Sequence, residues 1–252
     1  MIKITVLGSG TCAVTTRRSC ASYLLQLGKK QILLDIGFGA LRRLVEAGFD
    51  YRNIDGVICS HFHLDHIGDL LPLIMALQFT PNYKRSKSLN VIGPQQFRTF
   101  LHHCRDLHCE WVIPADGFEL LIHELHSEQL EIFSGLITAR TTRHTLYTNA
   151  YRIEYAGKSL FYSGDTGPCE DLIDLAADAD LAIIEASFPD EESFKYHLTP
   201  KEAGSLARQA HVKQLVLTHF YPMMDQIDVV AACSEEYKGV INIAEDFDTF
   251  TL

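Results

Sequence analysis

The stretch SHFHLDH at positions 60–66 decides how this sequence is interpreted. It follows directly after GVIC at 56–59, an apolar and β-branched run that is typical of a buried strand. Three histidines and one aspartate, His61, His63, Asp65 and His66, therefore gather at the end of that strand. Imidazole nitrogens and carboxylates held at strand ends are the ligands of zinc-type hydrolytic sites, so the stretch favours a metal site over a polar loop.

The spacing within this stretch indicates how its ligands are directed. His61 and His63 are two residues apart, so on an extended segment they point to the same side. Asp65 and His66 fall where the chain turns into the next helix, and they can face the same cavity from another side. One short loop can therefore supply ligands to two neighbouring metals. Further candidate ligands follow later apolar strands, namely His144, Asp165 in YSGDTG and His219 in LTHF.

Composition limits the class of protein. The 252 residues, 47% of them hydrophobic, are enough for one substantial core, and we expect a single domain over 1–252. A formal net charge of −10 argues against a general polyanion-binding surface. No apolar run is long enough for a membrane span, and no signal peptide is apparent at the N-terminus. The seven cysteines form no CxxC pair, which indicates reduced thiols and predicts a cytoplasmic protein.

Periodicity predicts strands and helices, then a block of strands, then strands and helices again. This order fits a four-layer αββα sandwich of the α/β class, with two packed sheets and helices outside. Thr199, Pro200 and Glu202 form a capping-box signature at the start of the fifth predicted helix. The predicted strands are 2–7, 22–27, 31–35, 56–60, 89–93, 118–125, 130–135, 136–141, 149–155, 158–164, 180–187 and 213–220, and the predicted helices 39–49, 67–79, 94–107, 169–179, 199–210 and 226–237.

The order HxHxDH, then His144, then GDTG, then THF resembles the metallo-β-lactamase superfamily of binuclear metallohydrolases. Asp35 in LLDIGFG resembles the aspartate that supports a metal ligand early in those chains. The resemblance implies two divalent metal ions, with zinc favoured and manganese or iron as alternatives. It assigns the candidate ligands as follows: His61, His63 and His144 to one metal, Asp65, His66 and His219 to the other, and Asp165 as the bridge between them.

Three further segments are similar to the ribonuclease Z-like branch of that superfamily. They are LGSGTCAVTTRRSCASYLL at 7–25, AIIEASF at 182–188 and KYHLTPKEAGSLARQA at 195–210. AIIEASF corresponds to a His-Glu-Ala-Thr-Phe segment in which Ile184 replaces the histidine. The resemblance implies that Glu185 keeps His197 protonated as the leaving-group acid. A hydroxide shared by the metals would be the nucleophile, positioned in addition by Asp65, and a homodimer is implied by resemblance alone.

The chain departs from ribonuclease Z in one respect. Those enzymes carry a protruding arm, rich in glycine and basic residues, that clamps transfer RNA and is expected between the equivalents of His144 and Asp165. Residues 145–164 are enough only for two strands and their turn. This favours a compact phosphodiesterase that acts on a small or cyclic phosphodiester. The alternative within this branch is processing of a tRNA 3′ end.

Other functions of the same fold stay open at this stage. A lactonase, thioesterase or sulfatase would use the same metals without needing the Glu185–His197 pair. A diiron oxidoreductase is disfavoured because such proteins resemble HxExDH, with an acidic ligand where this chain has His63. A non-catalytic binding protein is disfavoured because all seven candidate ligands are retained.

Two polar segments are weaker candidates. Arg17, Arg18 and YKRSK at 83–87 are candidate phosphate contacts, although such a charge run is usually a solvated loop. HHCRDLHCE contains His102, His103, Cys104, His108 and Cys109, but a second metal site there would need cleaner spacing. We interpret that segment as surface, or as part of a lid within 78–115.

Overall fold

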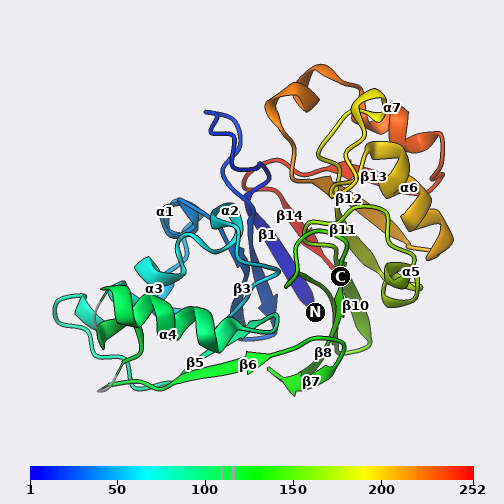
Figure 1. The fold of residues 1–252 in the computed structure, drawn as a ribbon. Helices are drawn as coiled ribbons and strands as arrows, with labels where there is room; N and C mark the ends of the chain where they lie inside the picture. The colour runs from blue at the N-terminus through cyan, green and yellow to red at the C-terminus, as the bar shows by residue number, and fades with distance from the viewer. Residues whose placement is uncertain (109, 115–116) are drawn as a thin grey trace.

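The computed structural model describes residues 1–108, 110–114 and 117–252. Within them, two seven-stranded sheets pack face to face, and helices cover both outer faces (Figure 1). The α/β four-layer αββα arrangement that the pattern predicts is therefore confirmed. The first sheet has the order β14-β1-β2-β3-β4-β5-β6, with β1 Ile2–Gly8, β2 Ser22–Leu27, β3 Lys30–Ile36, β4 Gly56–Ile58, β5 Leu89–Gly93, β6 Leu120–Glu124 and β14 Thr249–Thr251.

The second sheet has the order β13-β12-β11-β10-β9-β8-β7. It contains an antiparallel half, β7 to β10, and a parallel half, β10 to β13. Its strands are β7 Gln129–Ile132, β8 Gly135–Thr141, β9 Asn149–Tyr155, β10 Lys158–Tyr162, β11 Leu181–Glu185, β12 Gln214–Thr218 and β13 Val240–Ile243.

Three apolar clusters correspond to the three interfaces between the layers. The central one joins the inner faces of both sheets and includes Tyr23, Ile58, Tyr151 and Ile183. One outer cluster lies under α1 Ala40–Glu46, α3 Leu70–Phe79 and α4 Phe97–His108, and the other under α5 Asp171–Ala176, α6 Pro200–Gln209 and α7 Val229–Ser234. Burial of these three clusters is the main stabilising contribution to the fold.

Local signals account for where the helices begin and end. The capping box is present: Thr199 accepts a hydrogen bond from the Glu202 N–H, and the Glu202 side chain accepts one from the Thr199 N–H. The helix predicted at 67–79 is preceded by a separate turn, α2 Leu64–Ile67. Pro72 sits in the first turn of α3, where an amide has no intrahelical acceptor to lose.

Two of the predicted helices are about half as long as expected. The helix predicted at 226–237 is α7, which begins only after Asp228, because the Asp228 carboxylate accepts a hydrogen bond from the Ala231 N–H. The helix predicted at 169–179 is α5, and Asp178, with φ 54°, lies beyond its end in the left-handed region. None of the described helices is long and apolar enough to cross a membrane.

Candidate metal centre

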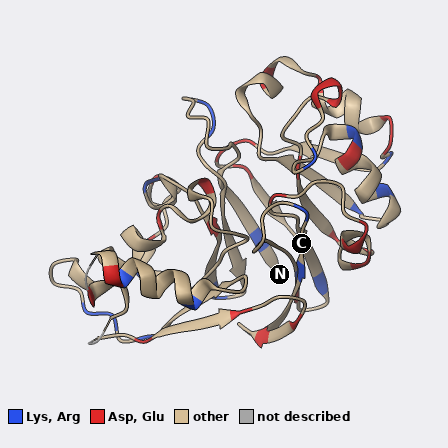
Figure 2. Cartoon of the chain, viewed as in Figure 1, with Lys and Arg blue, Asp and Glu red and all other residues tan. Residues whose placement is uncertain are grey.

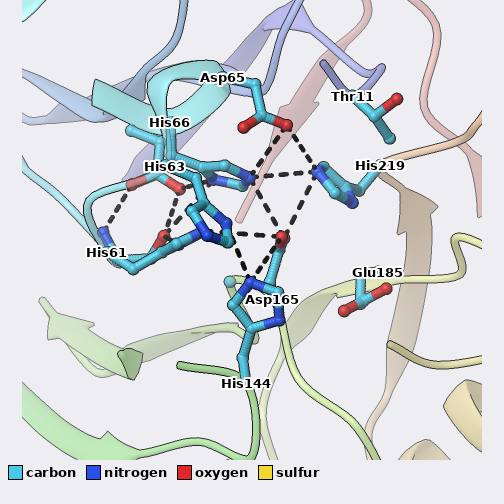
Figure 3. Close-up of polar contacts among 12 residues, drawn as sticks. Thr11, His61, His63, Asp65, His66, His144, Asp165, Glu185 and His219 are labelled. Carbon is cyan, nitrogen blue, oxygen red and sulfur yellow. Dashed lines mark hydrogen bonds and ion pairs between the residues drawn. The ribbon is translucent and has the colours of Figure 1, made fainter. Parts of the chain in front are cut away.

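The candidate ligands meet where strands of both sheets end. His61 and His63 follow β4, and the short helix α2 then carries Asp65 and His66 back toward the same point. His144 follows β8, Asp165 follows β10 and His219 follows β12. Because all these segments leave the carboxyl ends of their strands, four separate stretches of chain converge on one place, as Figure 3 shows.

The first group of ligand atoms comes from His61, His63, His144 and Asp165, which lie within 4.8 Å of one another. The Nε2 atom of His144 is 3.1 Å from Nδ1 of His63. The Oδ2 atom of Asp165 lies 3.7 Å from Nε2 of both His61 and His144. Three imidazoles and one carboxylate thus surround a common point, as the resemblance implies.

The second group comes from Asp65, His66 and His219. The Nε2 atoms of His66 and His219 are 3.1 Å apart, and Asp65 Oδ2 lies 3.8 Å from the first and 3.6 Å from the second. The other oxygen of Asp165, Oδ1, is 3.2 Å from His66 Nε2 and 3.4 Å from His219 Nε2. Asp165 therefore directs one oxygen to each group, which is the arrangement of a bridging ligand.

Three of the histidines make a hydrogen bond through Nδ1, the ring nitrogen that faces away from the ligand cluster, and these bonds indicate whether the residues can hold a metal ion. Nδ1 of His61 faces Ser60 Oγ at 2.9 Å, Nδ1 of His66 faces a carboxylate at 2.7 Å, and Nδ1 of His144 faces the Tyr196 carbonyl at 3.0 Å. A neutral imidazole that donates through Nδ1 directs the lone pair of Nε2 inward. Among the described residues, the buried atoms His61 Nε2 and Asp165 Oδ1 have no hydrogen-bond partner. Converging lone pairs and buried atoms without partners fit a divalent cation.

Burial and neighbouring charges shift the pKa values of these groups in opposite directions. Burial lowers the pKa of His61 well below its usual value, which favours the neutral ligand form. Burial also opposes ionisation of Asp65, but its hydrogen bond with His219 and the charge of His66 outweigh it and hold the pKa at about 2. For His66 the effect of burial is outweighed by the charges of Asp165 and Asp35, which raise the pKa. A proton therefore competes with a metal ion for the Nε2 atom of His66.

Comparison with known proteins agrees with this geometry. The model of the family described as "Beta-lactamase superfamily domain" matches residues 30–220. The chain belongs to the β-lactamase superfamily. An uncharacterized protein of Mycobacterium leprae is 30% identical over 100% of this chain and 89% of the relative, and a ribonuclease Z of Myxococcus xanthus is 25% identical over 100% and 97%. This superfamily member is therefore ribonuclease Z-like.

Solved structures agree on the fold. The metallo-β-lactamase fold protein YhfI of Bacillus subtilis matches with a TM-score of 0.85 and 24% identity, covering 99% of this chain and 98% of that one. The short form of human tRNase Z matches with a TM-score of 0.80 and 22% identity, covering 99% and 98%. The His/Asp cluster on this fold identifies the chain as a metal-dependent hydrolase in the broad sense.

In this superfamily member the Glu185–His197 pair, which the resemblance assigns to the leaving-group acid, lies beside the candidate metal centre. Glu185 ends β11, and its Oε1 lies 3.0 Å from Nδ1 of His197. His197 Nδ1 is 4.0 Å from Asp165 Oδ2, so the imidazole borders the ligand cluster. Burial lowers the pKa of His197, but the hydrogen bond with Glu185 and its charge outweigh this and raise it. The pair can therefore hold a proton next to the metal centre.

A pocket of about 520 Å³ opens onto the centre. His63, Asp65, Asp165, His197 and His219 form its polar wall. The rest of the wall comes from the opening loop (residues 9–21), the turn between β3 and α1, α2 and the segment after β12, and includes Cys12, Val14, Phe38, Leu64 and Tyr221. The pocket thus places a bound molecule against both ligand groups and the candidate acid.

The sequence reasoning missed several residues that hold the ligands in place. Ser60 and Tyr162 both donate to Asp35, and Ser187 contacts both Glu185 and His219. A signal was available for Ser187, because residues two apart on a strand share a face and Ser187 follows Glu185 by two. Ser60 and Tyr162 carried no comparable signal, since their shared partner is distant in the sequence.

The basic candidates for phosphate contact have other roles. Arg18 is buried and bonds to Asp225, Glu245 and the Ala244 carbonyl, and Arg17 pairs with the same two carboxylates. Arg85 of YKRSK is buried and donates to backbone carbonyls, among them Ile54 and Ser88. The arginines of both segments therefore hold loops together rather than face the pocket.

The described side chains of the segment at 102–110 form no ligand cluster. In the described part of the chain, the groups of three or more metal-ligand side chains that lie close enough together do not include His102, His103 or Cys104. Cys104 is half-buried on α4, and burial raises the pKa of its thiol. Cys109, the side chain of His108 and the end of the proposed lid at 115 lie outside the described residues.

Proposed function

We propose that the chain is a binuclear metal-dependent phosphodiesterase that hydrolyses a small phosphodiester, with Asp65, Glu185 and His197 in catalytic roles. The observation that carries the proposal is the position of His197. It is held by Glu185, borders the ligand cluster and lines the same pocket as the ligands. Hydrolysis of esters with good leaving groups does not need such an acid, whereas the alkoxide of a phosphodiester does.

We further propose that His61, His63 and His144 hold one metal ion and Asp65, His66 and His219 a second, with Asp165 shared. A donor set of five imidazoles and two carboxylates suits zinc, with manganese or iron as alternatives. When bound, the ions supply Lewis acidity toward phosphoryl oxygens and lower the pKa of nearby water. Two divalent ions against two carboxylates leave the pocket positive, which favours an anionic substrate without a basic surface.

His197 acts as the proton donor to the leaving oxygen. Its Nδ1 is occupied by Glu185, so Nε2 is the nitrogen that is free to donate. Glu185 is itself fixed, since Oε1 also accepts a hydrogen bond from the Thr166 N–H at 2.7 Å and Oε2 one from the Leu198 N–H at 3.2 Å. A carboxylate held this firmly keeps the imidazole oriented, and proton transfer by a positioned group accelerates such steps by about 10²–10⁴-fold.

Asp65 positions the attacking water. Its carboxylate lines the pocket, and its pKa of about 2 keeps it ionised at neutral pH. An ionised carboxylate only accepts hydrogen bonds, so it orients a water molecule by accepting a hydrogen bond from it. Asp65 and His197 both line the pocket, one as the acceptor and the other as the donor.

Chain length and charge support a small substrate. Between His144 and Asp165 the chain forms only β9, a two-residue turn at Ala156–Gly157 and β10, with no room for an RNA-clamping arm. The alignment with the Myxococcus ribonuclease Z spans 305 positions, so that relative has segments that these 252 residues lack. In Figure 2, acidic and basic residues alternate along both outer helical layers. We also propose that 1–252 act as one domain, since β14 pairs with β1 across the chain ends.

The test compares two substrates with zinc-loaded protein. Bis(4-nitrophenyl) phosphate has a good leaving group, and a 3′,5′-cyclic nucleotide has an alkoxide leaving group. His197→Ala should retain both metals and lose about 10²–10⁴-fold in kcat on the cyclic substrate, with a smaller loss on the nitrophenyl ester. His126→Ala, an exposed histidine between β6 and β7, is the matched control. Equal turnover by wild type and His197→Ala on the cyclic substrate would reject the acid role.

One alternative function has support of its own. Relatives named ribonuclease Z align over 98–100% of this chain, which keeps tRNA 3′ processing as the second candidate. Cleavage of a precursor tRNA at its 3′ end, with no turnover of small diesters, would favour it. No turnover of any phosphodiester by fully metallated protein would instead direct attention to carboxylic esters, thioesters or lactones.

A further inference from the structure

Ser187 lies where the proposed metal centre and the proposed acid pair meet. It is completely buried and follows the end of β11 by two residues. Its Oγ donates a short hydrogen bond to Glu185 Oε2 and lies 2.9 Å from both Nδ1 and the backbone carbonyl of His219. One hydroxyl therefore contacts the residue that holds the acid and a residue of the second ligand group.

The hydrogen-bond inventory fixes the direction of this chain of contacts. A serine hydroxyl has one proton and two lone pairs. With a metal bound at Nε2 of His219, which faces His66 and Asp165, its Nδ1 would carry the proton and donate to Ser187 Oγ. The single serine proton has two acceptors in reach, and it is directed to Glu185 Oε2 because this oxygen is nearer and charged, whereas the His219 carbonyl is neutral. The other oxygen of Glu185 accepts from His197. The order is His219 to Ser187 to Glu185, with His197 bonded to the other side of the carboxylate.

Backbone contacts strengthen the same link. His219 has a φ of 60°, a left-handed conformation that few residues other than glycine adopt and that the surrounding structure has to hold. The carbonyl of this residue lies 2.9 Å from Ser187 Oγ, but the single serine proton goes to Glu185. The backbone hydrogen bond of Ser187 is the one that its N–H donates to the carbonyl of Leu198, next to His197. Ser187 thus holds backbone on the side of the acid, and its link to the metal ligand runs through the imidazole of His219.

We propose that Ser187 is a positioning residue that couples metal binding to the acid step, through its hydroxyl contacts with His219 and Glu185. The proposal rests on the proposed function for the roles of those two residues. It goes further because it predicts that one side chain outside both sets of functional residues sets the properties of both. Without the hydroxyl, His219 loses the acceptor that fixes its tautomer and Glu185 loses a donor.

The test measures metal affinity in the full chain, which needs no substrate. Ser187→Ala should bind zinc about 10- to 100-fold more weakly in competition with a chromophoric chelator, which is the usual effect of removing a partner of a metal-bound histidine. Its cobalt form should show a shifted visible spectrum, because His219 is a direct ligand. Ser187→Thr keeps the hydroxyl and should restore both values, since threonine stands at this place in the segment that the chain resembles.

The matched control is Ser159→Ala, another buried serine, whose hydroxyl bonds to Asp180. It should lower stability without changing zinc affinity or the cobalt spectrum. If Ser187→Ala does not fold, Ser187→Cys replaces it, because a thiol is only a weak donor and acceptor and should give an intermediate loss of affinity. Zinc binding as tight as wild type in Ser187→Ala, or in Ser187→Cys if that variant is used, would overturn the proposal.

The effect of Ser187 on proton donation by His197 is measured by comparing kcat on the two substrates. In Ser187→Ala, kcat should fall more on the cyclic nucleotide than on bis(4-nitrophenyl) phosphate, because only the alkoxide needs the proton of His197. An equal fall on both substrates would contradict the link to the acid. If the wild type hydrolyses no phosphodiester, the proposed function fails by itself, and the zinc and cobalt measurements still decide the role of Ser187.

Discussion

Asp35 Oδ2 lies 2.7 Å from Nδ1 of His66 in the interior of the protein, where both side chains are fully buried. The same carboxylate accepts hydrogen bonds from the Ser60 N–H at 2.6 Å, the Ser60 hydroxyl at 2.7 Å and the Tyr162 hydroxyl at 2.6 Å. All of its partners are donors, so Asp35 acts purely as an acceptor. The contact fixes the tautomer of His66 and turns its Nε2 toward the other ligands.

The first prediction concerns this carboxylate. Asp35→Asn replaces one acceptor oxygen with an NH₂ group, and either orientation of the amide then faces a donor. We expect a loss of about 1–3 kcal/mol in the free energy of unfolding, together with about 10- to 100-fold weaker zinc binding. Tyr162→Phe removes only one donor and should cost about 0.5–1.5 kcal/mol. Urea unfolding and chelator competition measure the two effects, and unchanged zinc affinity in Asp35→Asn would contradict the role.

The second prediction concerns a close approach of backbone at the metal centre. A Cβ atom at Gly37 would lie 2.0 Å from the backbone carbonyl oxygen of Asp65, so Gly37→Ala must displace the turn that carries two candidate ligands. We expect it to weaken zinc binding as well as to cost about 1–3 kcal/mol of stability through overpacking. Gly48→Ala is the control, because it has φ 84° and open space around it. That variant should cost about 1–2 kcal/mol from backbone strain and leave zinc affinity unchanged.

Much of the candidate site was predictable because its signals are local. His61 and His63, Asp165 and His219 each follow an apolar strand, and strand ends can be identified from a few neighbouring residues. The same holds for the capping box at Thr199, which needs only four consecutive residues. Parallel strands then bring such ends to one edge of the fold, as the four-layer prediction requires.

Hydrogen-bond partners that are distant in the sequence could not be found in this way. Tyr162 and Asp35 are separated by 127 residues, and nothing local marks a tyrosine in an apolar strand as a donor to a buried carboxylate. Arg18 is the opposite case, since an arginine beside a pocket loop suggests phosphate contact until its partners are known. Pairing of this kind depends on packing between sheets, which periodicity does not encode.

The third prediction distinguishes two possible roles of Arg18, contact with a substrate phosphate and stabilisation of the loop that it bonds to. Its guanidinium bonds to Asp225, to Glu245 and to the Ala244 carbonyl, which ties the opening loop to the C-terminal segment. Arg18→Ala should therefore lower the free energy of unfolding by about 1.5–3 kcal/mol, the value for a hydrogen-bonded charged group, with little change in KM. Arg17→Ala, a half-exposed neighbour in the same network, should cost about 0–1 kcal/mol. A raised KM with unchanged stability in Arg18→Ala would instead indicate contact with the substrate.

The fourth prediction is a pH dependence that lies outside the metal centre. Partial burial opposes ionisation of Asp180, but hydrogen bonds from Lys213, the Ser159 N–H and Lys158 outweigh it and hold the pKa at about 2, below the usual 3.8. Because the pKa is lower in the folded state, the ionised group stabilises the fold fully above about pH 4, and this contribution disappears as the pH falls toward 2. Wild type should therefore exceed Asp180→Asn in stability by a constant amount above pH 5, with the difference shrinking between pH 4 and 2. Urea unfolding across this range, with exposed Asp174→Asn as the control, measures it, and a difference that does not change with pH would show that the ion pairs of Asp180 contribute nothing to stability.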